Sequence, residues 1–442
     1  MKNQVKIANV IKPFKRKKIF VSSDKSLSIR CVLLSSIAVG RSKIFNLLES
    51  EDVINSLKII KKLGVNYKKN KDYFEIFGVG IGGYDVKNNT ILDAGNSGTL
   101  ARCILGLLSS LDKNIKLIGD RSLSRRDFIR VIRPLNLFGV KTKSINGTLP
   151  LEIKGTKLLR PINFYENKAS AQVKTCVIFS AMNTPGITKI KAKKSRNHTE
   201  LLLKYLNYPI RIKKLKSFDE IHVKGLNQIK SFDYKLPGDI SSASFFIVLT
   251  LLSKNSSLII KNINLNPSRI GILKILNKMN AKINIVNRKK YRGELIGDIK
   301  IKSSIKLTPI NCPESLNSSA IDEFLLIFLV AAKSKGVSTF RKLDELNKKE
   351  SPRLNLAISF LKMIGIKVIK KKDIIKIYGN SELKLNKSYH IQKFLKDHRI
   401  FMMSVIAALT LGGKWKINDK DSIKTSFPNF LEIVKKLGAK IN

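Results

Sequence analysis

The chain contains few of the features that mark secreted or membrane proteins. Its 442 residues include only four cysteines, none of which forms a CxxC pair: Cys31, Cys103, Cys176 and Cys312. The longest apolar run, Phe324–Ala332, is far shorter than the roughly 20 residues that cross a bilayer. The N-terminal stretch is basic but lacks the apolar segment of a signal peptide. We therefore expect reduced, buried thiols in a cytoplasmic protein that spans no membrane.

Acidic side chains are scarce relative to basic ones. The sequence has 32 Asp and Glu against 84 Lys and Arg, a formal net charge of +52, and only 7% aromatic residues. The lysines are spread along the whole chain beside Ile and Asn, a composition typical of an AT-rich genome, and no aromatic-interleaved basic platform is visible. We interpret the charge as mainly compositional, with some attraction for anionic substrates. A nucleic-acid-binding protein is kept as the alternative, resting on net charge alone.

Signals for a metal or an organic cofactor are also missing. The four histidines are scattered, at His198, His222, His390 and His398, without the spacing of a metal site. The glycine-rich stretch GVGIGG (78–83) lies between two expected strands, whereas a dinucleotide loop must be followed by a helix. No Ser or Cys lies in a nucleophile motif. The sequence predicts neither metal nor cofactor.

Six segments share one pattern, in which an amphipathic helix ends at a turn-forming residue and a short strand follows. The marked positions lie 70 to 85 residues apart, at Gly64, Gly139, Pro209, Asn280, Gly365 and Gly438. Gly and Asn favour the left-handed conformation that commonly ends a helix; at Pro209 the preceding Asn207 is an alternative cap. With 43% hydrophobic residues the chain can form substantial cores, so we expect a duplicated α/β architecture of two or three domains.

Several expected helices begin with small polar and cationic residues. In LDAGNSGTLAR (92–102), Gly95 and Gly98 leave the backbone open and Arg102 follows one turn later. The first N–H groups of a helix lack internal partners and carry partial positive charge, which suits an anion. Similar helix starts occur in SDKSLSIR, GDRSLSRR, NKASAQVK, KKSRNHTE, PGDISSAS, KKESPR and KDHR. So many cationic helix starts predict a multiply anionic ligand.

Three residues differ from simple anion holders: Asp322, Glu350 and Lys25. A carboxylate held near substrate phosphates keeps its proton more readily, which suits general acid–base catalysis near neutral pH. We expect acid–base chemistry on a phosphorylated, carboxylated small molecule.

These segments, together with AIDE and TSFP and in this order, resemble the 5-enolpyruvylshikimate-3-phosphate synthase family, the 3-phosphoshikimate 1-carboxyvinyltransferases, over nearly the whole chain. The resemblance implies an α/β fold of two similar domains, each built from three βαβαββ units as an inside-out α/β barrel, with the active site in the interdomain cleft. The chain would cross between domains near Lys25 and near Asp239. One domain would comprise residues 1–24 plus 238–442 and the other residues 25–237.

The family's reaction transfers the enolpyruvyl group of phosphoenolpyruvate to the 5-hydroxyl of shikimate 3-phosphate and releases phosphate, in the shikimate pathway to chorismate and aromatic amino acids. Addition gives a tetrahedral intermediate and elimination follows, so a proton reaches the methylene carbon and later leaves it. The resemblance implies these two substrates as partners. We also expect no specific nucleic acid, no cofactor and a monomer.

Residue roles follow from the same resemblance. Asp322 resembles the proton acceptor at the sugar-like hydroxyl, and Glu350 with Lys25 resembles the group that handles the methylene proton. The residues implied for shikimate 3-phosphate are Lys25, Ser26, Arg30, Ser170, Gln172, Arg196, Asp322 and Lys349. Those implied for phosphoenolpyruvate are Lys25, Gly98, Arg126, Gln172, Arg353, Arg399 and Lys424, with the register of Lys424 held loosely.

The sequence departs from the family pattern at five positions: Ser23 replaces Gly, Ile29 replaces His, Asp127 replaces Pro, Asn347 replaces Arg and Pro352 replaces Asp. No implied binding residue is lost, so we expect activity, although Pro352 can alter the geometry of its neighbours.

The sister enolpyruvyltransferase, which acts on a UDP-amino sugar, is a rival interpretation. It uses a cysteine on a mobile loop, whereas Cys103 lies within an expected helix, TLARCILGLL. The sequence disfavours this rival.

Overall fold

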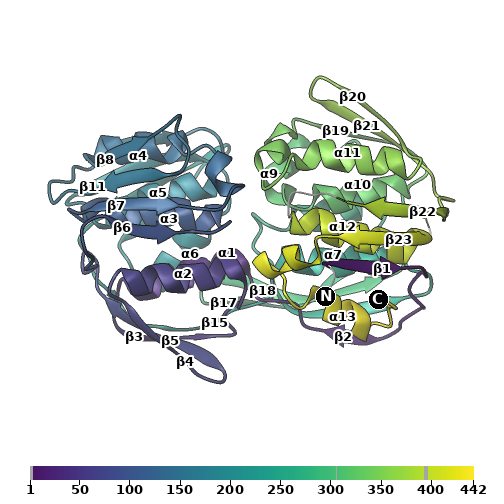
Figure 1. Cartoon of the computed structure of the whole chain (residues 1–442), viewed down its shortest axis with the longest axis horizontal. Coiled ribbons are helices and arrows are strands. Elements are labelled where there is room, and N and C mark those ends of the chain that lie inside the picture. The colour runs from purple at the N-terminus through teal and green to yellow at the C-terminus, as the bar shows by residue number, and fades with distance from the viewer. Residues whose placement is uncertain (1–2, 305, 393–396) are drawn as a thin grey trace. The chain divides into compact units, whose positions relative to one another are not determined.

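The computed structural model describes residues 3–304, 306–392 and 397–442. The chain forms two compact units (Figure 1). Unit 1 contains residues 1–22, 237–289 and 295–442, and unit 2 contains residues 23–236 together with the short segment 290–294. Within the described residues each unit contains three small β-sheets, which combine parallel and antiparallel strand pairs except in β19–β21–β20, where both pairs are antiparallel.

One strand order recurs in the sheets of unit 2. The sheet β6–β7–β9–β8 has one parallel pair, β6 with β7, and two antiparallel pairs. Along the chain its elements run as one βαβαββ unit: β6 (Thr90–Asp93), α3 (Gly98–Leu107), β7 (Asn114–Ile118), α4 (Ile129–Phe138), β8 (Lys141–Ser144) and β9 (Leu151–Lys154). The next unit repeats this order with β10 (Asn163–Glu166), α5 (Ala171–Met182), β11 (Ile187–Lys193), α6 (His198–Tyr205), β12 (Ile210–Lys214) and β13 (Phe218–Lys224).

The third sheet of unit 2 is closed by strands from the end of that unit's main segment. Its elements are α1 (Lys25–Ser36), β3 (Ala38–Phe45), α2 (Glu51–Lys62), β4 (Asn66–Lys69), β5 (Tyr73–Val79), β14 (Ile229–Lys230) and β15 (Asp233–Lys235). Both β14 and β15 pair in parallel with β3. The strands that pair in parallel with β3 therefore come from about 190 residues later in the chain, since Asp233 pairs with Lys43.

Unit 1 is organised similarly, although two of its sheets, β19–β21–β20 and β1–β23–β22, have three strands among the described residues. Its first sheet and helices comprise β2 (Lys17–Ile19), α7 (Ile240–Leu252), β16 (Ser257–Asn264), α8 (Gly271–Lys278), β17 (Ile283–Tyr291) and β18 (Glu294–Lys302). The second comprises α9 (Asn317–Ala320), α10 (Phe324–Ala332), β19 (Gly336–Arg341), α11 (Arg353–Met363), β20 (Lys367–Lys371) and β21 (Ile374–Gly379). The third comprises β22 (Leu385–Ile391), α12 (His398–Leu411), β23 (Gly412–Asn418), α13 (Phe430–Lys436) and the N-terminal strand β1 (Gln4–Ile7).

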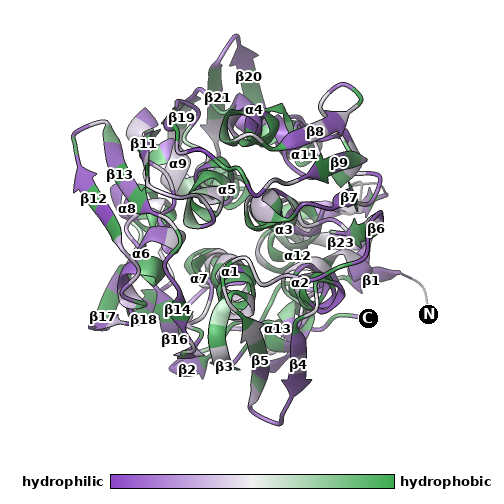
Figure 2. Cartoon of the chain, turned by 90° about the vertical axis from the view of Figure 1, so that its left-hand side faces the viewer, coloured by the Kyte–Doolittle hydropathy of each residue, from purple (hydrophilic) through white to green (hydrophobic). Residues whose placement is uncertain are grey.

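Three helices in each unit are buried on nearly all sides. In unit 2 these are α1, α3 and α5, and in unit 1 they are α7, α10 and α12; within each unit they pack against one another. The sheets of unit 2 lie around its central helices (Figure 2). Helices such as α2, α4 and α8 are amphipathic and bury one face only, which accounts for the helical periodicity seen in the sequence.

The repeated helix ends are confirmed. The backbone is left-handed at Gly64, Gly139, Asn280, Gly365 and Gly438. At the Pro209 segment the left-handed residue is Asn207, which directly follows Leu206, the C-cap of α6. After the last helix end no strand is assigned, but Asn442 and Lys6 exchange two backbone hydrogen bonds of 2.7 and 3.1 Å.

Side chains that cap helices are the local reason why five of the six central helices begin where they do; α10 has no such cap. The N-caps Asp24, Ser97, Ser170, Asp239 and Asp397 each accept a hydrogen bond from a backbone N–H of the first turn of α1, α3, α5, α7 and α12 respectively. These first turns are the segments that the sequence marked as cationic helix starts, and GVGIGG is confirmed as the end of β5 followed by a turn.

All four cysteines are free and buried, as expected. Burial raises the pKa of the Cys312 thiol to about 11 and raises that of Cys31 further. Among the described residues no single helix has the length and apolar character of a membrane span. Two consecutive helical segments, Glu314–Ala320 and Phe324–Ala332, have this length and apolar character only when taken together, and the chain bends by 120° between them.

Candidate active site

In unit 1 three cations surround the carboxylate of Asp322, just before α10. Its oxygens lie 3.5 Å from Lys349 Nζ, 3.5 Å from Arg353 Nη1 and 4.0 Å from Arg399 Nη2. Arg399 Nη1 also donates to the Asp322 carbonyl oxygen at 2.9 Å. Glu350 joins the group through Arg353 Nη2 at 2.5 Å. The structure thus brings together all the unit 1 residues implied by the resemblance except Lys424.

Arg353 is the centre of this cluster. Its side chain is 2% exposed and donates to Asp397 from Nε at 2.8 Å and from Nη2 at 3.2 Å. Burial disfavours the charged guanidinium, but the nearby Asp397 and Glu350 outweigh burial and raise the pKa of Arg353. The guanidinium is therefore a permanent cation fixed between three carboxylates.

Asp397 was not singled out as a site residue, yet it organises two that were. It is fully buried, accepts from Ser351 Oγ at 2.7 Å and binds Arg353. As the N-cap of α12 it also accepts from the backbone N–H of Arg399 at 3.0 Å. Burial opposes ionisation, but Arg353 holds the pKa of Asp397 below its usual value. Its position before an apolar helix was the available sequence signal.

A second buried chain of contacts reaches Arg399 from α7. Ser241 Oγ donates to Glu323 Oε1 at 2.5 Å, and Arg399 Nη1 lies 3.7 Å from the same oxygen. Arg269 contacts both Asp239 and Ser241 at 2.9 and 2.8 Å. No sequence pattern identified Arg269, because its partners lie about 30 residues away at the start of α7.

Lys424 differs from the other implied ligands. It lies in the 3-10 helix Lys420–Thr425, is 61% exposed and pairs with Asp421 at 2.7 Å. The adjacent Thr425 Oγ1 lies 3.1 Å from His398 Nδ1 at the start of α12. Lys424 is therefore near the cluster in the chain fold but is not one of the cations around Asp322.

In unit 2 the start of α3 lies between two arginines. A side chain at Gly98 would place its Cβ 2.9 Å from Arg102 Nη1 and 3.0 Å from Arg126 Nη1. Arg126 donates to Asn96 Oδ1 at 3.0 Å, and Arg102 donates to Gln172 Oε1 at 2.7 Å. Backbone N–H groups and two guanidinium groups thus face one small region, which suits a phosphate or carboxylate.

Arg102 is a functional candidate that the implied site omits. Burial lowers the pKa of its guanidinium to about 10, and Arg126 adds to this lowering. The group lies 4.8 Å from the centre of the Phe128 ring and also donates to the Asp127 carbonyl oxygen at 2.9 Å. It therefore orients Gln172 and adds positive charge at the start of α3.

The first two turns of α1 carry Lys25, Ser26 and Arg30. Lys25 Nζ pairs with Asp52 at 2.8 Å, and both groups are largely shielded. Arg30 is buried and donates to Ser26 O at 3.0 Å, Thr199 Oγ1 at 2.8 Å and Thr175 Oγ1 at 3.1 Å.

The first turn of α5 carries the remaining implied ligands of this unit apart from Arg196. Ser170 caps α5, and Gln172 links the Arg102 guanidinium to Thr99 at 3.0 Å. Arg196 lies two residues before α6.

The substitutions relative to the family pattern are accommodated locally. Pro352 is the N-cap of α11, where the absence of an N–H leaves no helix bond unmade, and Glu350 still contacts Arg353. Ser23 Oγ donates to Asn46 O at 2.6 Å, Ile29 is fully buried, and Asp127 accepts from Ile129 N at 2.7 Å. Asn347 bonds both the backbone and the side chain of Asn355.

No group of three or more His, Cys, Asp or Glu side chains within residues 3–304, 306–392 and 397–442 is arranged to hold a metal ion.

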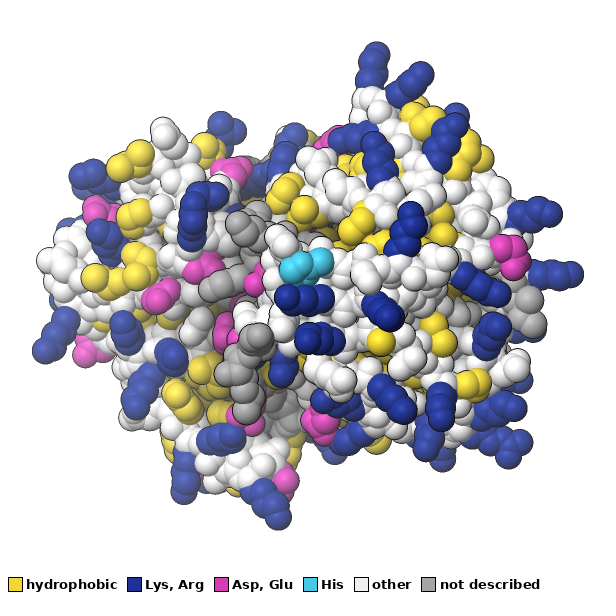
Figure 3. Space-filling model, turned by 45° about the vertical axis from the view of Figure 1, so that its right-hand side comes forward, with side chains coloured by type: hydrophobic (Ala, Val, Ile, Leu, Met, Phe, Trp, Pro, Cys, Tyr) yellow, Lys and Arg dark blue, Asp and Glu magenta, His cyan; other side chains and the backbone are white. Residues whose placement is uncertain are grey.

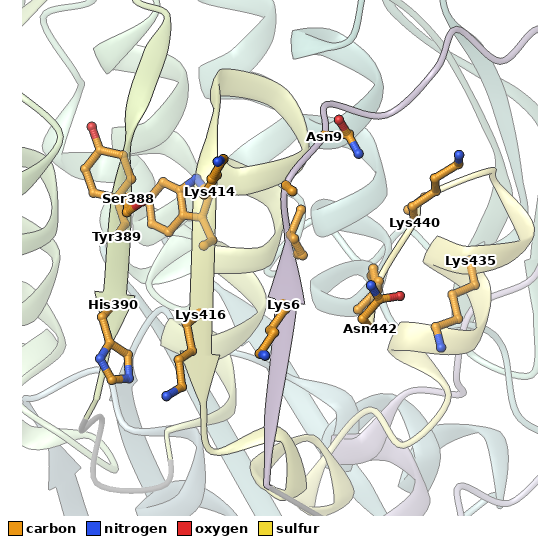
Figure 4. Close-up of a pocket in the computed structure, with 15 residues that line it drawn as sticks. Lys6, Asn9, Ser388, Tyr389, His390, Lys414, Lys416, Lys435, Lys440 and Asn442 are labelled. Atoms are coloured by element: carbon orange, nitrogen blue, oxygen red, sulfur yellow. The ribbon is translucent and has the colours of Figure 1, made fainter.

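A separate groove in unit 1 holds none of the implied site residues. It has a volume of about 820 Å³ and lies over β1, β23 and the chain end. Of the residues that the structure describes, no Asp or Glu side chain lines it, and five lysines do: Lys6, Lys414, Lys416, Lys435 and Lys440 (Figure 4). Lys and Arg are also scattered over the face in Figure 3, as the sequence predicted, so this groove is one basic feature among many.

Comparisons with known proteins agree with this geometry. The family model described as EPSP synthase (3-phosphoshikimate 1-carboxyvinyltransferase) matches residues 14–434. The 3-phosphoshikimate 1-carboxyvinyltransferase of Ruthia magnifica subsp. Calyptogena magnifica is 40% identical over 426 residues, which are 96% of this chain and 95% of the relative.

Solved structures give the same result. The EPSP synthase from Acinetobacter baumannii superposes with a TM-score of 0.87 at 32% identity, over 99% of both chains. The enolpyruvyl transferase NikO from Streptomyces tendae has a TM-score of 0.74 over 99% of this chain and 98% of its own, but at 15% identity it supports the fold alone. The resemblance drawn from the sequence is confirmed: the chain belongs to the EPSP synthase family.

Proposed function

We propose that this protein transfers the enolpyruvyl group of phosphoenolpyruvate to the 5-hydroxyl of shikimate 3-phosphate and releases phosphate. The observation that carries the proposal is the cluster around Asp322. One carboxylate lies within 4.0 Å of three cations, and Glu350 contacts one of them. A site that transfers protons beside bound anions needs carboxylates to transfer the protons and cations to bind the anions, and the two kinds of group must lie close together.

Addition begins at the acceptor hydroxyl. Asp322, which lies within 4.0 Å of three cations, accepts the proton of the 5-hydroxyl as the hydroxyl oxygen attacks C2 of phosphoenolpyruvate. The methylene carbon C3 gains a proton and becomes a methyl group in the tetrahedral intermediate. Glu350 with Lys25 handles this proton, while Arg353 fixes the Glu350 carboxylate at 2.5 Å.

Elimination reverses the proton movement. A proton leaves the methyl group, the double bond forms again, and the C2–O bond to phosphate breaks. The balance is one enolpyruvyl ether and one phosphate, with no net oxidation. Lys349, together with Ser26, Arg30, Ser170 and Arg196, holds shikimate 3-phosphate in this proposal.

Phosphoenolpyruvate needs cations for both its phosphate and its carboxylate. Gly98 leaves the start of α3 open beside Arg126, and Arg353 and Arg399 supply further positive charge. Gln172, oriented by Arg102 at 2.7 Å, contacts both ligands. Lys424 is retained as a peripheral ligand of phosphoenolpyruvate, reached once its exposed contact with Asp421 is exchanged for the substrate.

Comparing shikimate 3-phosphate with the UDP-amino sugar of the sister enolpyruvyltransferase tests which acceptor the protein uses. Phosphate release from phosphoenolpyruvate is measured with shikimate 3-phosphate, with shikimate and with a UDP-amino sugar. The proposal predicts release with shikimate 3-phosphate, at least about 100-fold slower release with shikimate because cationic groups then lose their anion, and none with the UDP-amino sugar. Comparable release with the UDP-amino sugar would overturn it; Cys103, fully buried in α3, is unsuited to that chemistry.

A further inference from the structure

The first turn of α6 contains three consecutive buried polar residues. His198, Thr199 and Glu200 are each at most 2% exposed. They directly follow Arg196 and Asn197, and Arg196 is the residue proposed to hold shikimate 3-phosphate. A short helix of eight residues (His198–Tyr205) has little stability of its own, so these contacts decide where its start lies.

Two of the three residues fix α6 to the central helices of unit 2. Thr199 Oγ1 accepts from Arg30 Nε on α1 at 2.8 Å and lies 2.8 Å from Thr175 Oγ1 on α5. Glu200 pairs with Lys174 on α5 at 2.6 Å, where both side chains are at most 3% exposed.

The third residue binds a distant part of the chain. His198 Nδ1 lies 2.6 Å from Glu294 Oε1, and both side chains are fully buried. Glu294 begins β18 at the tip of the β17–β18 hairpin. The tip, residues 290–294, packs with unit 2, whereas the strands that flank it continue in unit 1.

The hairpin tip fits closely against α6. A Cβ at Gly293 would lie 2.7 Å from the Leu201 carbonyl oxygen, so only glycine leaves this approach open. The Tyr291 hydroxyl accepts from Lys235 N at 3.2 Å, and the Arg292 guanidinium lies 5.7 Å from the centre of the Tyr205 ring. The Glu294 carboxylate is therefore held in one place, and His198 is held with it.

We propose that Glu294, acting through His198, is a positioning residue that fixes the start of α6 and thereby holds Arg196 in place for the phosphate of shikimate 3-phosphate. This proposal rests on the proposed function, since it assigns Arg196 to that ligand. Glu294, in the second half of the sequence, would thus position Arg196, a substrate-binding residue in the first half.

The test compares KM for each substrate and kcat in the full-length protein. Glu294→Ala should raise KM for shikimate 3-phosphate roughly 10-fold, the effect of about 1.4 kcal/mol, and leave KM for phosphoenolpyruvate within about 2-fold, a change of roughly 0.4 kcal/mol. Glu294→Gln keeps an oxygen that can accept from His198 Nδ1 and should restore most of the loss. Equal increases in both KM values, or no recovery with Gln, would overturn the proposal.

A double-substitution cycle with Arg196→Ala distinguishes positioning from general packing. If Glu294 acts through Arg196, Glu294→Ala should add little to KM for shikimate 3-phosphate once Arg196 is absent. Fully additive effects would contradict the proposal. Should the alanine variant not fold, Glu294→Asp, which shortens the side chain but keeps its charge, enters the same cycle.

Asp298→Ala is the matched control, because Asp298 lies on the same strand β18 and contacts Lys261, Asn262 and Asn287. This substitution should lower the unfolding temperature without changing the ratio of the two KM values. If it changes that ratio as Glu294→Ala does, the effect belongs to the stability of the hairpin.

Calorimetric binding of shikimate 3-phosphate to the wild type and to Arg196→Ala distinguishes failure of the proposed function from failure of the positioning role. A wild type that does not bind it removes the proposed function, whereas normal binding without the Glu294 effect removes only the positioning role.

Discussion

At the scale of single residues, reactivity depends on which carboxylates stay close to cations. Asp322 and Glu350 are 12% and 19% exposed, so substrate can reach them. Asp397 is fully buried and holds Arg353 in place. Arg353 therefore contacts two kinds of carboxylate. Asp322 and Glu350 are accessible and reactive, whereas Asp397 is buried and structural.

Removing the charge of either reactive carboxylate should slow proton transfer and preserve binding of the substrate. We expect Asp322→Asn and Glu350→Gln each to lower kcat by at least about 100-fold, the usual effect of losing a general acid or base. Binding of shikimate 3-phosphate, measured by calorimetry, should change little.

Glu345→Gln is the control for that pair, because Glu345 belongs to the exposed ion pair with Lys348. Its kcat should equal the wild-type value. Unchanged kcat in both Asp322→Asn and Glu350→Gln would remove the acid–base account.

At the scale of elements, the start of α12 connects stability to the site. Asp397 caps this helix and pairs with Arg353 at the start of α11. Because its folded-state pKa is lowered, its stabilising effect is complete above the unfolded-state value of about 3.9. The effect is lost as the pH falls through the folded-state pKa.

Asp397→Asn should therefore lower the free energy of unfolding by about 3 kcal/mol near neutral pH, since it leaves a buried guanidinium poorly compensated. The difference from the wild type should shrink as the pH falls below about 4. Urea unfolding of both proteins across this pH range measures it.

Asp421→Asn provides the comparison, because Asp421 forms an exposed pair with Lys424. Its cost should stay below about 1 kcal/mol. Equal costs for the two substitutions, or a cost of Asp397→Asn that is independent of pH, would refute the role given to Asp397.

Local patterns in the sequence predicted the elements well because they depend on neighbouring residues. Helix caps, left-handed helix ends and amphipathic periodicity involve positions within a few residues of one another, and Gly64 or Asp24 could be identified from them. The partners of the site residues could not. Asp52 lies 27 residues from Lys25, and Asp397 lies 44 residues from Arg353, so their contacts follow from tertiary packing.

At the scale of the whole molecule, the spacing of the helix ends predicted a duplicated α/β architecture, whereas the βαβαββ order was implied by the family resemblance. The packing of segment 290–294 with unit 2 left no comparable signal in the sequence, since His198 and Glu294 are 96 positions apart and meet only in the folded chain. The high positive net charge likewise does not predict the fold, but it does predict non-specific binding of polyanions.

The net charge of +52 predicts adventitious binding of polyanions. Single-stranded nucleic acid should bind without sequence preference, and its affinity should fall steeply between about 50 and 200 mM salt. Fluorescence anisotropy over this range measures it, and replacement of Lys414 and Lys416 in the lysine-lined groove by Glu should weaken binding only slightly. Sequence-specific binding that persists at high salt would favour the nucleic-acid alternative.

The most direct test of the account is to identify the products formed from phosphoenolpyruvate and shikimate 3-phosphate in deuterated water by NMR. Protonation of the methylene carbon followed by loss of a proton from the resulting methyl group predicts phosphate and an enolpyruvyl ether whose vinyl carbon carries deuterium. An ether without deuterium would contradict the addition–elimination mechanism assigned to Glu350 and Lys25, and no ether from folded protein would contradict the proposed function itself.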